Sequence, residues 1–273
     1  MNLKEALKHT ISPADLQVLI RSYDIIGDIG VIMIPEGLEH HESLIAEAIL
    51  DIHRNVKTIL KRDGLYSGEH RTVPLTYIAG EDKTETLCRE FGIRLMLDLK
   101  TVYFSVRSGN ERKRIADLVQ PGEKILVMFS GVAPFPLMIE KYSKASSITG
   151  VEINKRAHDY GLINVRLNKA QNISLIHGDA LQVAGSSQAR FDRIVMPLPA
   201  HAELFLKHAI QALAPSGALH FYDFRAKASF QESIDLIMTT AAELDRSVRC
   251  SEAVVCGHNS PNSYRICVDA IIN

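Results

Sequence analysis

Residues 122–156 decide the fold: GEKILVMFSGVAPFPLMIEKYSKASSITGVEINKR. The apolar run at 125–129 predicts a buried strand, the small residues at 130–133 a tight turn, and the segment from Pro134 a helix. A second apolar strand follows and ends at Glu152, which comes 21 residues after Gly131. In a parallel sheet the carboxyl ends of two such strands lie side by side, where nucleotide-like ligands bind. At this spacing a carboxylate can accept both hydroxyls of a ribose.

The turn between these two strands also indicates which ligand it accepts. Dinucleotide-binding folds need a GxGxxG turn to bring a pyrophosphate onto the helix N-terminus, whereas Gly131 is the only glycine in this turn. A ligand that carries adenosine but no phosphate fits better, so the stretch predicts S-adenosylmethionine. An ordinary buried strand–helix–strand unit without a ligand is the alternative interpretation of this stretch alone.

Composition describes a protein with a substantial core. The chain has 273 residues, of which 46% are hydrophobic, enough for one large domain or two smaller ones. It contains no run of eighteen apolar residues, and its N-terminus lacks the layout of a signal peptide, so we expect a cytoplasmic protein without a membrane segment. The four cysteines form no CxxC pair, which argues against a disulfide framework and a structural zinc. A net charge of −1 provides no global basic field, so any RNA recognition has to use local patches.

Periodicity divides the chain into a helical extension at 1–22, a small α+β module at 23–100 and an α/β domain at 101–273. Ser12 and Pro13 form a plausible N-cap and first-turn pair. In the module we expect a β hairpin or bent strand at 25–35, a helix at 39–53, and strands at 56–60, 71–79 and 93–99. In the larger domain we expect strands at 124–129, 147–152, 173–177, 192–196, 217–223, 250–256 and 263–271, and helices at 108–119, 134–143, 155–167, 200–213 and 229–245. Seven strands in this order, the last two antiparallel, predict the methyltransferase form of the Rossmann-like, doubly wound sheet.

Two further strand ends carry candidate ligand contacts. Asp179 ends the third strand, where it can accept a hydrogen bond from an adenine amine or, alternatively, cap the following helix. Pro197 belongs to Met-Pro-Leu-Pro after the fourth strand, a rigid loop whose carbonyls can face a planar base, or simply a rigid connection. Arg107 and Glu111 are four residues apart and share a helix face if the helix starts early enough, so a structural ion pair is one interpretation.

Basic and histidine residues give weaker signals. Clustering alone makes Lys61, Arg62, and the three basic residues at 112–114 candidate phosphate contacts. His201, His220 and His258 have no third partner at ligand spacing, so we expect no metal.

Four blocks of the sequence carry a family resemblance, at 23–29, 80–86, 103–112 and 128–135. Together they resemble the archaeal–eukaryotic-type tRNA (guanine-37-N1) methyltransferases and the related wybutosine-pathway aminocarboxypropyl transferases, over nearly the whole chain. Only some twenty residues precede the first block, which is similar to the short forms of the family that lack the N-terminal accessory domain. The resemblance implies a class I methyltransferase domain preceded by an RNA-positioning module, and a tRNA anticodon stem-loop as the partner of a monomeric enzyme.

The resemblance also implies roles for individual residues. Glu111 stands where the family has its general base, and Arg71 stands where the family has the arginine that stabilises the guanine O6. Tyr103 and Arg107 match positions near the methyl donor. The implied donor-binding residues are these two together with Phe129, Ser130, Gly131, Glu152, Ile153, Asp179, Ala180 and Pro197.

Three positions depart from the family pattern. Val127 replaces an acid, Ala133 replaces a second glycine, and Pro197 replaces an asparagine whose amide can contact the base.

The sequence leaves three alternatives to a G37 methyltransferase. An aminocarboxypropyl transferase is disfavoured by the combination of Arg107 and Glu111 and by Leu-Pro after the fourth strand. A non-catalytic RNA-binding module is disfavoured by retention of Glu111, Glu152 and Asp179 together. A small-molecule or protein methyltransferase is disfavoured by the N-terminal blocks.

Overall fold

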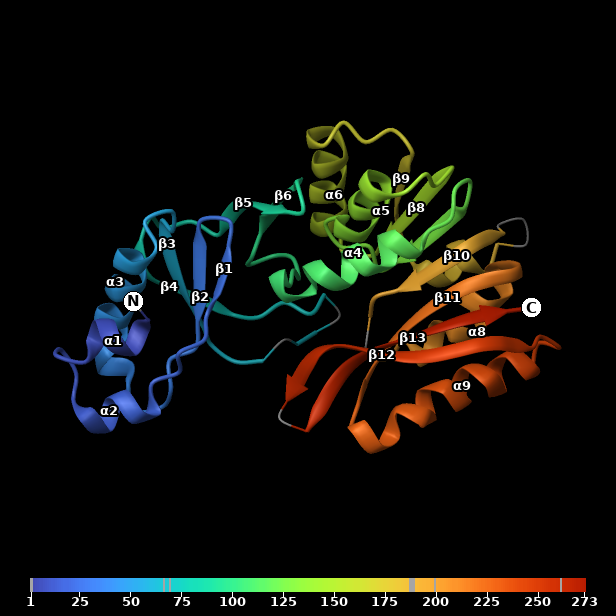
Figure 1. Cartoon of the computed structure of the whole chain (residues 1–273). Coiled ribbons are helices and arrows are strands. Elements are labelled where there is room, and N and C mark those ends of the chain that lie inside the picture. Colours follow the sequence, from blue (N-terminus) through green and yellow to red (C-terminus); the bar gives the residue numbers. More distant parts are fainter. Residues whose placement is uncertain (1, 66, 69, 187–189, 199, 261) are drawn as a thin grey trace. The chain divides into compact units, whose positions relative to one another are not determined.

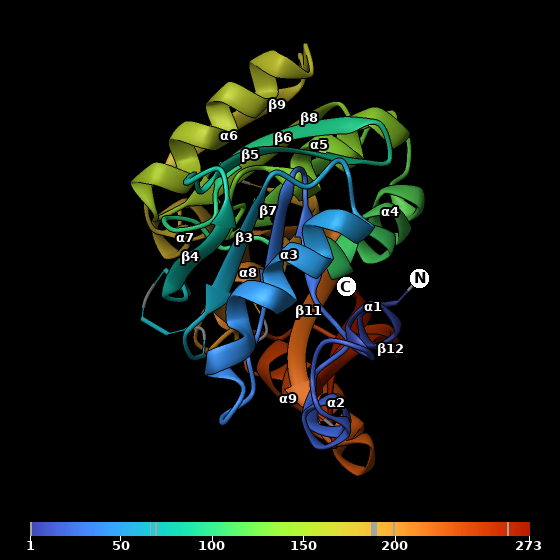
Figure 2. The same cartoon turned by 90° about the vertical axis from the view of Figure 1, so that its left-hand side faces the viewer.

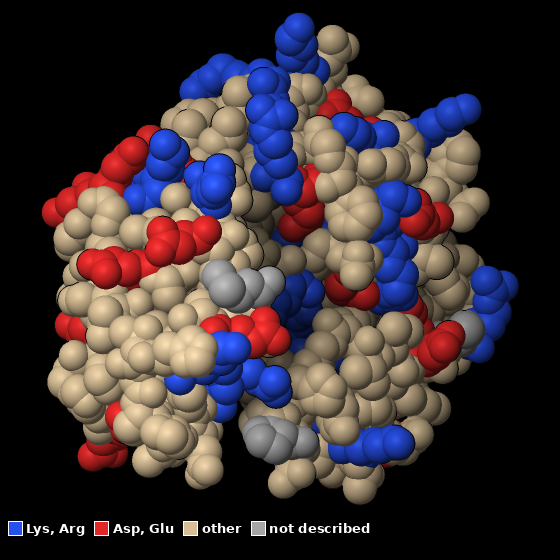
Figure 3. All heavy atoms as spheres, turned by 60° about the vertical axis from the view of Figure 1, so that its left-hand side comes forward, with Lys and Arg blue, Asp and Glu red and all other residues tan. Residues whose placement is uncertain are grey.

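The structure is a computed structural model that describes residues 2–65, 67–68, 70–186, 190–198, 200–260 and 262–273. The chain forms two compact units, Met1–Val106 and Arg107–Asn273 (Figure 1). The division falls six residues after the position expected from periodicity. No helix among the described ranges is long and apolar enough to cross a membrane. On the face drawn in Figure 3, Lys and Arg side chains are interspersed with Asp and Glu side chains, in keeping with the net charge of −1.

The N-terminal unit is built on a four-stranded sheet of order β1-β2-β3-β4. Its strands are β1 (Asp24–Ile26), β2 (Ile29–Ile32), β3 (Thr58–Arg62) and β4 (Leu75–Gly80). Strands β2 and β3 are parallel because helix α3 (Glu42–Ile52) connects them, whereas the other two pairs are antiparallel. Helix α3 packs its buried Ile45 and Ile49 against Ile59 of the sheet, and Figure 2 shows this helix in front of β3.

The first residues of the chain belong to the core of this unit. Helix α1 (Leu3–Leu7) has a capping box at its N-cap residue Asn2. Helix α2 (Pro13–Val18) is capped by Ser12, whose side chain accepts a hydrogen bond from the Asp15 N–H. The predicted Ser12 cap is confirmed. Leu3 and Leu7 are buried in the same cluster as α3, so burial of apolar surface holds these short helices in place.

A two-stranded hairpin, β5 (Glu85–Glu90) and β6 (Ile93–Asp98), completes the N-terminal unit. Strand β6 was predicted, but β5 was not. The inward side chains of β5 are Thr86 and Cys88, whereas the apolar Leu87 lies between them and charged residues occupy both ends of the strand, so it carries no strong apolar alternation. Thr86 is buried, and its hydroxyl is satisfied there because it donates to the Asp28 carboxylate at 2.7 Å.

The C-terminal unit is a seven-stranded sheet of order β12-β13-β11-β10-β7-β8-β9. Strands β10, β11, β7, β8 and β9 pair in parallel, while β13 pairs antiparallel with both β11 and β12. The predicted Rossmann-like methyltransferase sheet is confirmed. The strands are β7 (Lys124–Met128), β8 (Ser147–Glu152), β9 (Ile173–His177), β10 (Phe191–Met196), β11 (Leu213–Arg225), β12 (Val248–Ser260) and β13 (Ser263–Ile272).

Helices cover both faces of this sheet, with α4, α5 and α6 on one side and α8 and α9 on the other (Figure 1). Residues 125–128 of β7 are all fully buried, which explains why they form a continuous apolar run rather than an alternating one. The helices are α4 (Gly109–Leu118), α5 (Pro134–Tyr142), α6 (Lys155–Leu167), α7 (Ala180–Ala184), α8 (Glu203–Ala212) and α9 (Phe230–Ala242). The short helix α7 was not predicted, because five residues are too few for a helical period to be recognised.

Candidate active site

The loop that follows β7 has an unusual backbone. Phe129 and Ala133 have φ values of 57° and 67°, and Gly131 between them has φ 56°. An L-residue in this left-handed region costs on the order of 1–2 kcal/mol, so the loop is kept at the expense of stability. The surroundings hold it in place: the Ser130 N–H donates to the Val151 carbonyl at 2.8 Å, and the Asn164 side-chain amide donates to the Val132 carbonyl at 3.0 Å.

Glu152 fastens this loop to the end of β8. The Gly131 N–H donates to Glu152 Oε2 at 2.7 Å, and the Asn154 N–H donates to Glu152 Oε1 at 2.8 Å. Two backbone donors therefore fix the position and orientation of the carboxylate at the sheet edge. An ionised carboxylate offers about four acceptor positions, so one group can hold the loop and also accept ribose hydroxyls.

The other residues predicted to contact S-adenosylmethionine lie at the ends of neighbouring strands, since β10, β7, β8 and β9 are adjacent in the sheet. Ile153, directly after β8, is 43% exposed. Asp179 follows β9 and caps α7 by accepting a hydrogen bond from the Leu181 N–H at 2.9 Å, and Ala180 is the buried first residue of that helix. The capping role of Asp179 is thus present, while its contact to adenine stays a prediction. Pro197 follows β10 inside a tight turn closed by the Leu198 N–H and the Met196 carbonyl; Pro199 lies outside the described residues.

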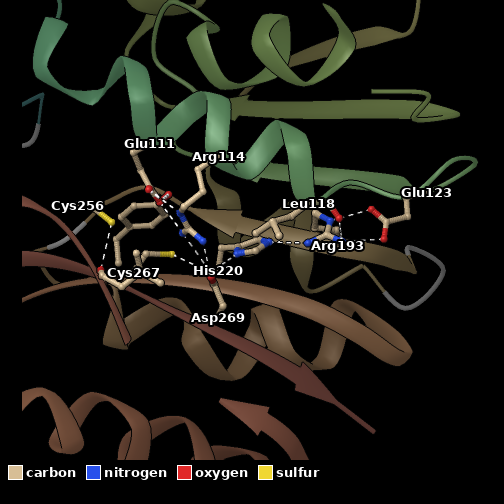
Figure 4. Close-up of polar contacts among 11 residues, drawn as sticks. Glu111, Arg114, Leu118, Glu123, Arg193, His220, Cys256, Cys267 and Asp269 are labelled. Carbon is tan, nitrogen blue, oxygen red and sulfur yellow. Dashed lines mark hydrogen bonds and ion pairs between the residues drawn. The ribbon is translucent and has the colours of Figure 1, made fainter. Parts of the chain in front are cut away.

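Glu111 lies on α4 and is only 7% exposed. Its Oε1 accepts hydrogen bonds from the Tyr222 hydroxyl at 2.6 Å and from Arg114 Nη2 at 2.7 Å, and its Oε2 accepts one from Arg114 Nε at 2.8 Å (Figure 4). All three contacts have the carboxylate as acceptor. The site therefore presents a buried, oriented carboxylate whose partners Arg114 and Tyr222 come from its own helix and from β11, with Cys256 of β12 beside it.

A chain of polar contacts continues from Glu111 along the sheet (Figure 4). Arg114 donates from Nη1 to Asp269 at 2.5 Å, and Asp269 contacts His220 Nδ1 at 2.5 Å. Arg193 Nη1 lies 2.7 Å from His220 Nε2, while Nε and Nη2 of the same guanidinium donate to the Glu123 carboxylate at 2.7 and 2.9 Å. Because an arginine can only donate, His220 Nε2 accepts and its Nδ1–H donates to Asp269.

Strand register explains how these side chains meet. His220 is paired with Asp269 across β11 and β13, and Tyr222 is paired with Cys267 two residues further along. Alternate residues of a strand share a face, so all four side chains lie on one side of the sheet. The sequence does contain a signal for this cluster: polar residues occupy alternate positions in the apolar strands, at His220 and Tyr222 and at Cys267 and Asp269. The predictions made from the sequence did not use this signal.

Burial controls which members of the network carry charge. Burial lowers the pKa of His220 and raises the pKa of Tyr222, so both are neutral near pH 7. Burial, together with the nearby Glu111 carboxylate, raises the pKa of the Cys256 thiol to about 12. Burial alone would raise the pKa of Asp269, but the hydrogen bonds from His220 and Arg114 outweigh it and hold that pKa well below its usual range.

Arg71 and Tyr103 both lie in the N-terminal unit and are close to each other. The guanidinium carbon of Arg71 is 5.5 Å from the centre of the Tyr103 ring, within the range of a cation–π contact. Arg71 has φ 50° in a turn closed by its own N–H and the Gly68 carbonyl at 3.1 Å. Tyr103 is 37% exposed.

Comparison with protein families identifies the chain. The family model described as the TRM5/TYW2 methyltransferase domain matches residues 86–249, more than half of the chain, and the TYW2 N-terminal domain matches residues 3–84. The chain belongs to the TRM5/TYW2 methyltransferase family. The predicted family resemblance is confirmed, and the family accounts for the Rossmann-like sheet and for S-adenosylmethionine as the cofactor.

Individual members of the TRM5/TYW2 family are similar over most of the chain. The tRNA (guanine(37)-N(1))-methyltransferase Trm5b of Pyrococcus abyssi is 38% identical, over 91% of this chain and 74% of the relative. The tRNA 4-demethylwyosine(37)-methyltransferase Taw21 of Saccharolobus solfataricus is 31% identical, over 76% of this chain and 79% of the relative. The solved complex of aTrm5 and tRNALeu superposes with a TM-score of 0.86 at 28% identity, and covers 100% of this chain and 78% of that chain.

Three expectations about basic residues of this TRM5/TYW2 chain are wrong. Arg112 is only 4% exposed and Arg114 is bound to Glu111 and Asp269, so neither is available as a phosphate contact. Residues consecutive on a helix point in different directions, about 100° apart, so sequence clustering does not make one patch. Helix α4 begins at Gly109, after Arg107, and Glu111 pairs with Arg114 rather than with Arg107.

The remaining candidate phosphate contacts also have neighbours inside the protein. Lys113 pairs with Asp117 and lies 4.3 Å from the centre of the Tyr142 ring. Lys61 pairs with Glu42 at 2.9 Å, and Arg62 contacts the sulfur of Met33.

The expectation about histidines needs a correction as well. His220 does have close polar partners, because ligand-type atoms of His220, Cys267 and Asp269 lie within 4.8 Å of one another. Arg193 and Asp269 already contact the two ring nitrogens of His220, which makes this cluster part of the ionic network. We assign no metal ligands here.

Proposed function

We propose that this protein transfers the methyl group of S-adenosylmethionine to N1 of guanine 37 in the anticodon stem-loop of a tRNA. The similarity to Pyrococcus abyssi Trm5b over 91% of the chain is the observation that carries the proposal. The strand-end loop and the buried Glu111 support it, because they supply a candidate donor site and a candidate base within one unit.

The loop after β7 fits the donor. A Cβ atom added at Gly131 would meet nothing within 4 Å, so this backbone borders open space beside the Glu152 carboxylate. In the proposal Glu152 holds the ribose, Asp179 and Ala180 hold the adenine edge, and the exposed Ile153 covers a ring face. The backbone of Phe129, Ser130 and Gly131 holds the methionine part, and Tyr103, Arg107 and Pro197 border the transferred group. When bound, S-adenosylmethionine supplies a methyl group activated by a sulfonium.

Glu111 is the proposed general base. Guanine N1 is a poor nucleophile while it carries its proton, so the proton has to pass to a carboxylate as the N1 electron pair bonds to the methyl carbon. Deprotonation moves negative charge onto the guanine O6, and Arg71 of the N-terminal unit is assigned to stabilise that charge. Both groups act on the base, so their loss should lower turnover while leaving donor binding intact.

The departures from the family pattern are compatible with this proposal. Val127 is fully buried in the middle of β7, between Gly150 and Val195 of the neighbouring strands, where an apolar residue suits the core. Ala133 keeps the left-handed backbone that a glycine would adopt without strain.

A second candidate activity is methylation or aminocarboxypropylation of 4-demethylwyosine at the same position. Two observations favour it: the match of residues 3–84 to the TYW2 N-terminal domain, and the similarity to Taw21. Because the base, not the donor, distinguishes the methyl-transfer reactions, the substrate tRNA has to discriminate between them.

Dual labelling tests the proposal. The purified protein is incubated with S-adenosylmethionine labelled on the methyl group or on the carboxyl group, and with tRNA carrying G37, A37 or 4-demethylwyosine-37. Methyl label in G37 tRNA alone, lost in Glu111→Gln and kept in the exposed control Glu203→Gln, is the expected result. Carboxyl label in tRNA, or methyl label only in the 4-demethylwyosine substrate, would establish the second candidate. No transfer of either label would leave an RNA-binding protein.

We further propose that the enzyme is a cytoplasmic monomer that needs no metal. Light scattering at micromolar concentration should give the mass of one chain, 30.3 kDa, and EDTA should leave methyl transfer unchanged.

A further inference from the structure

Arg114 is shared by two carboxylates. Its Nε and Nη2 atoms donate to Glu111 at 2.8 and 2.7 Å, and its Nη1 donates to Asp269 at 2.5 Å, with Nη2 3.3 Å from the other Asp269 oxygen. One guanidinium therefore has two anionic partners, one on its own helix and one on β13 (Figure 4). Its pKa is raised by Glu111 and Asp269 in spite of the opposing effect of burial, so Arg114 stays charged.

The network as a whole carries one excess negative charge. Glu111, Asp269 and Glu123 are acidic, Arg114 and Arg193 are basic, and His220 is held neutral by burial. Arg193 and Glu123 neutralise each other through two hydrogen bonds. Glu111 and Asp269 are then left to share the single positive charge of Arg114.

We propose that Asp269 is a positioning residue that keeps Arg114 neutralised when Glu111 takes up the proton of the substrate base. This inference rests on the proposed function, in which Glu111 is the general base. With Asp269 present, a proton moving from N1 of the base to Glu111 leaves a neutral Arg114–Asp269 pair. Without Asp269, the same proton would leave a half-buried guanidinium with no anionic partner, a state that burial makes costly.

The remaining groups that face Glu111 do not replace Asp269. Tyr222 on β11 donates to Glu111 and stabilises its charged form, which opposes protonation. Cys256 on β12 and Cys267 on β13 are neutral thiols, because burial raises the pKa of both. His220 donates to Asp269 and helps to keep it ionised, and Arg193 lies beyond His220. Among the groups that the described residues place around Arg114, Asp269 is thus the second counter-charge.

The first experiment measures single-turnover methyl transfer to G37 tRNA as a function of pH for the wild type, Asp269→Asn, Tyr222→Phe and Asp223→Asn. Asp223 is the matched control, since it is a half-buried aspartate of the same sheet that pairs with Arg225. Asp269→Asn should move the acid limb of the rate to lower pH by about one unit or more, Tyr222→Phe should move it to higher pH, and Asp223→Asn should leave it unchanged. S-adenosylhomocysteine affinity should be equal in all four proteins.

The second experiment follows the proton on Glu111 directly and does not require turnover. The full chain is labelled with 13C at the glutamate side-chain carboxyl, and the Glu111 signal is assigned from its absence in Glu111→Gln. Its titration midpoint should fall in Asp269→Asn and rise in Tyr222→Phe. An unmoved midpoint in a folded Asp269→Asn protein would overturn the inference. If this titration shifts as expected but the wild type methylates no tRNA, the proposed function fails while the role of Asp269 in controlling Glu111 stands.

Discussion

Gly131→Ala tests whether the open space beside the loop after β7 is the donor site, and Gly122→Ala is its matched control. Both glycines have left-handed backbone, with φ 56° and 88°, and a Cβ atom added at either would meet nothing within 4 Å. Both lie in the C-terminal unit, but only Gly131 contacts Glu152. The two substitutions therefore impose similar backbone strain and differ in what the new methyl group faces.

The expected stability change is similar for the two variants. Left-handed backbone costs an alanine about 1–2 kcal/mol, and the loss of unfolded-state freedom returns about 0.4–1 kcal/mol. Each variant should then lose about 1 kcal/mol of unfolding free energy in urea titrations. The affinity for S-adenosylmethionine should differ between the two variants, because the methyl group added in Gly131→Ala occupies space assigned to S-adenosylmethionine.

Calorimetric titration with S-adenosylhomocysteine measures that difference. Gly131→Ala should bind at least about tenfold more weakly than Gly122→Ala, equivalent to about 1.4 kcal/mol. Equal affinities in two folded variants would refute the assignment of the donor to this loop, whatever their stabilities. A large loss in both would show that strain alone, transmitted through the sheet edge, controls binding.

Two further predictions concern Glu152 and His220. The side-chain amide in Glu152→Gln has one acceptor oxygen for the Gly131 and Asn154 N–H groups, so one of these N–H groups loses its partner, at a cost of about 1–3 kcal/mol. Urea unfolding should show lower stability, and titration with S-adenosylhomocysteine should show weaker binding. Wild-type values in both measurements would contradict the role of Glu152 in holding the loop. Burial lowers the pKa of His220, so below about pH 6.5 the unfolded chain binds a proton that the folded chain does not. The unfolding free energy should therefore fall as the pH drops below about 6.5, by at most about 1.4 kcal/mol per pH unit for this residue. The depressed pKa of Asp269 adds a loss only below about pH 4. Urea titrations from pH 7.5 to 4.5 should show a shallower slope for His220→Gln, and identical slopes would exclude His220 as the titrating group.

Much of the fold follows from local sequence pattern. All seven strands of the C-terminal sheet and the helices of ten or more residues in both units were predicted, because each has an apolar period long enough to recognise. The Ser12 cap was predicted from a two-residue signal. Strand β5 and helix α7 were missed, the first because Thr86 and Cys88 face its core and the second because it is short.

The candidate donor residues share this local character. Gly131 and Glu152 were selected by their spacing within one strand–helix–strand unit, and the structure joins them by a hydrogen bond of 2.7 Å. Their contact was predictable because neighbouring parallel strands place their carboxyl ends together. Their roles toward ribose remain predictions that the Gly131 and Glu152 variants test.

The surroundings of Glu111 could not be predicted in the same way. Tyr222 is 111 residues away in sequence, and Asp269 is 155 residues from Arg114. These contacts depend on the order of strands in the sheet and on the register between β11 and β13, neither of which leaves a periodic signal near Glu111. Hydrophobic periodicity reports which face of an element is buried, but it does not report which distant polar group shares that face. Only the tertiary fold, by bringing Glu111, Arg114 and Asp269 into contact, decides that three separate charges act as one network.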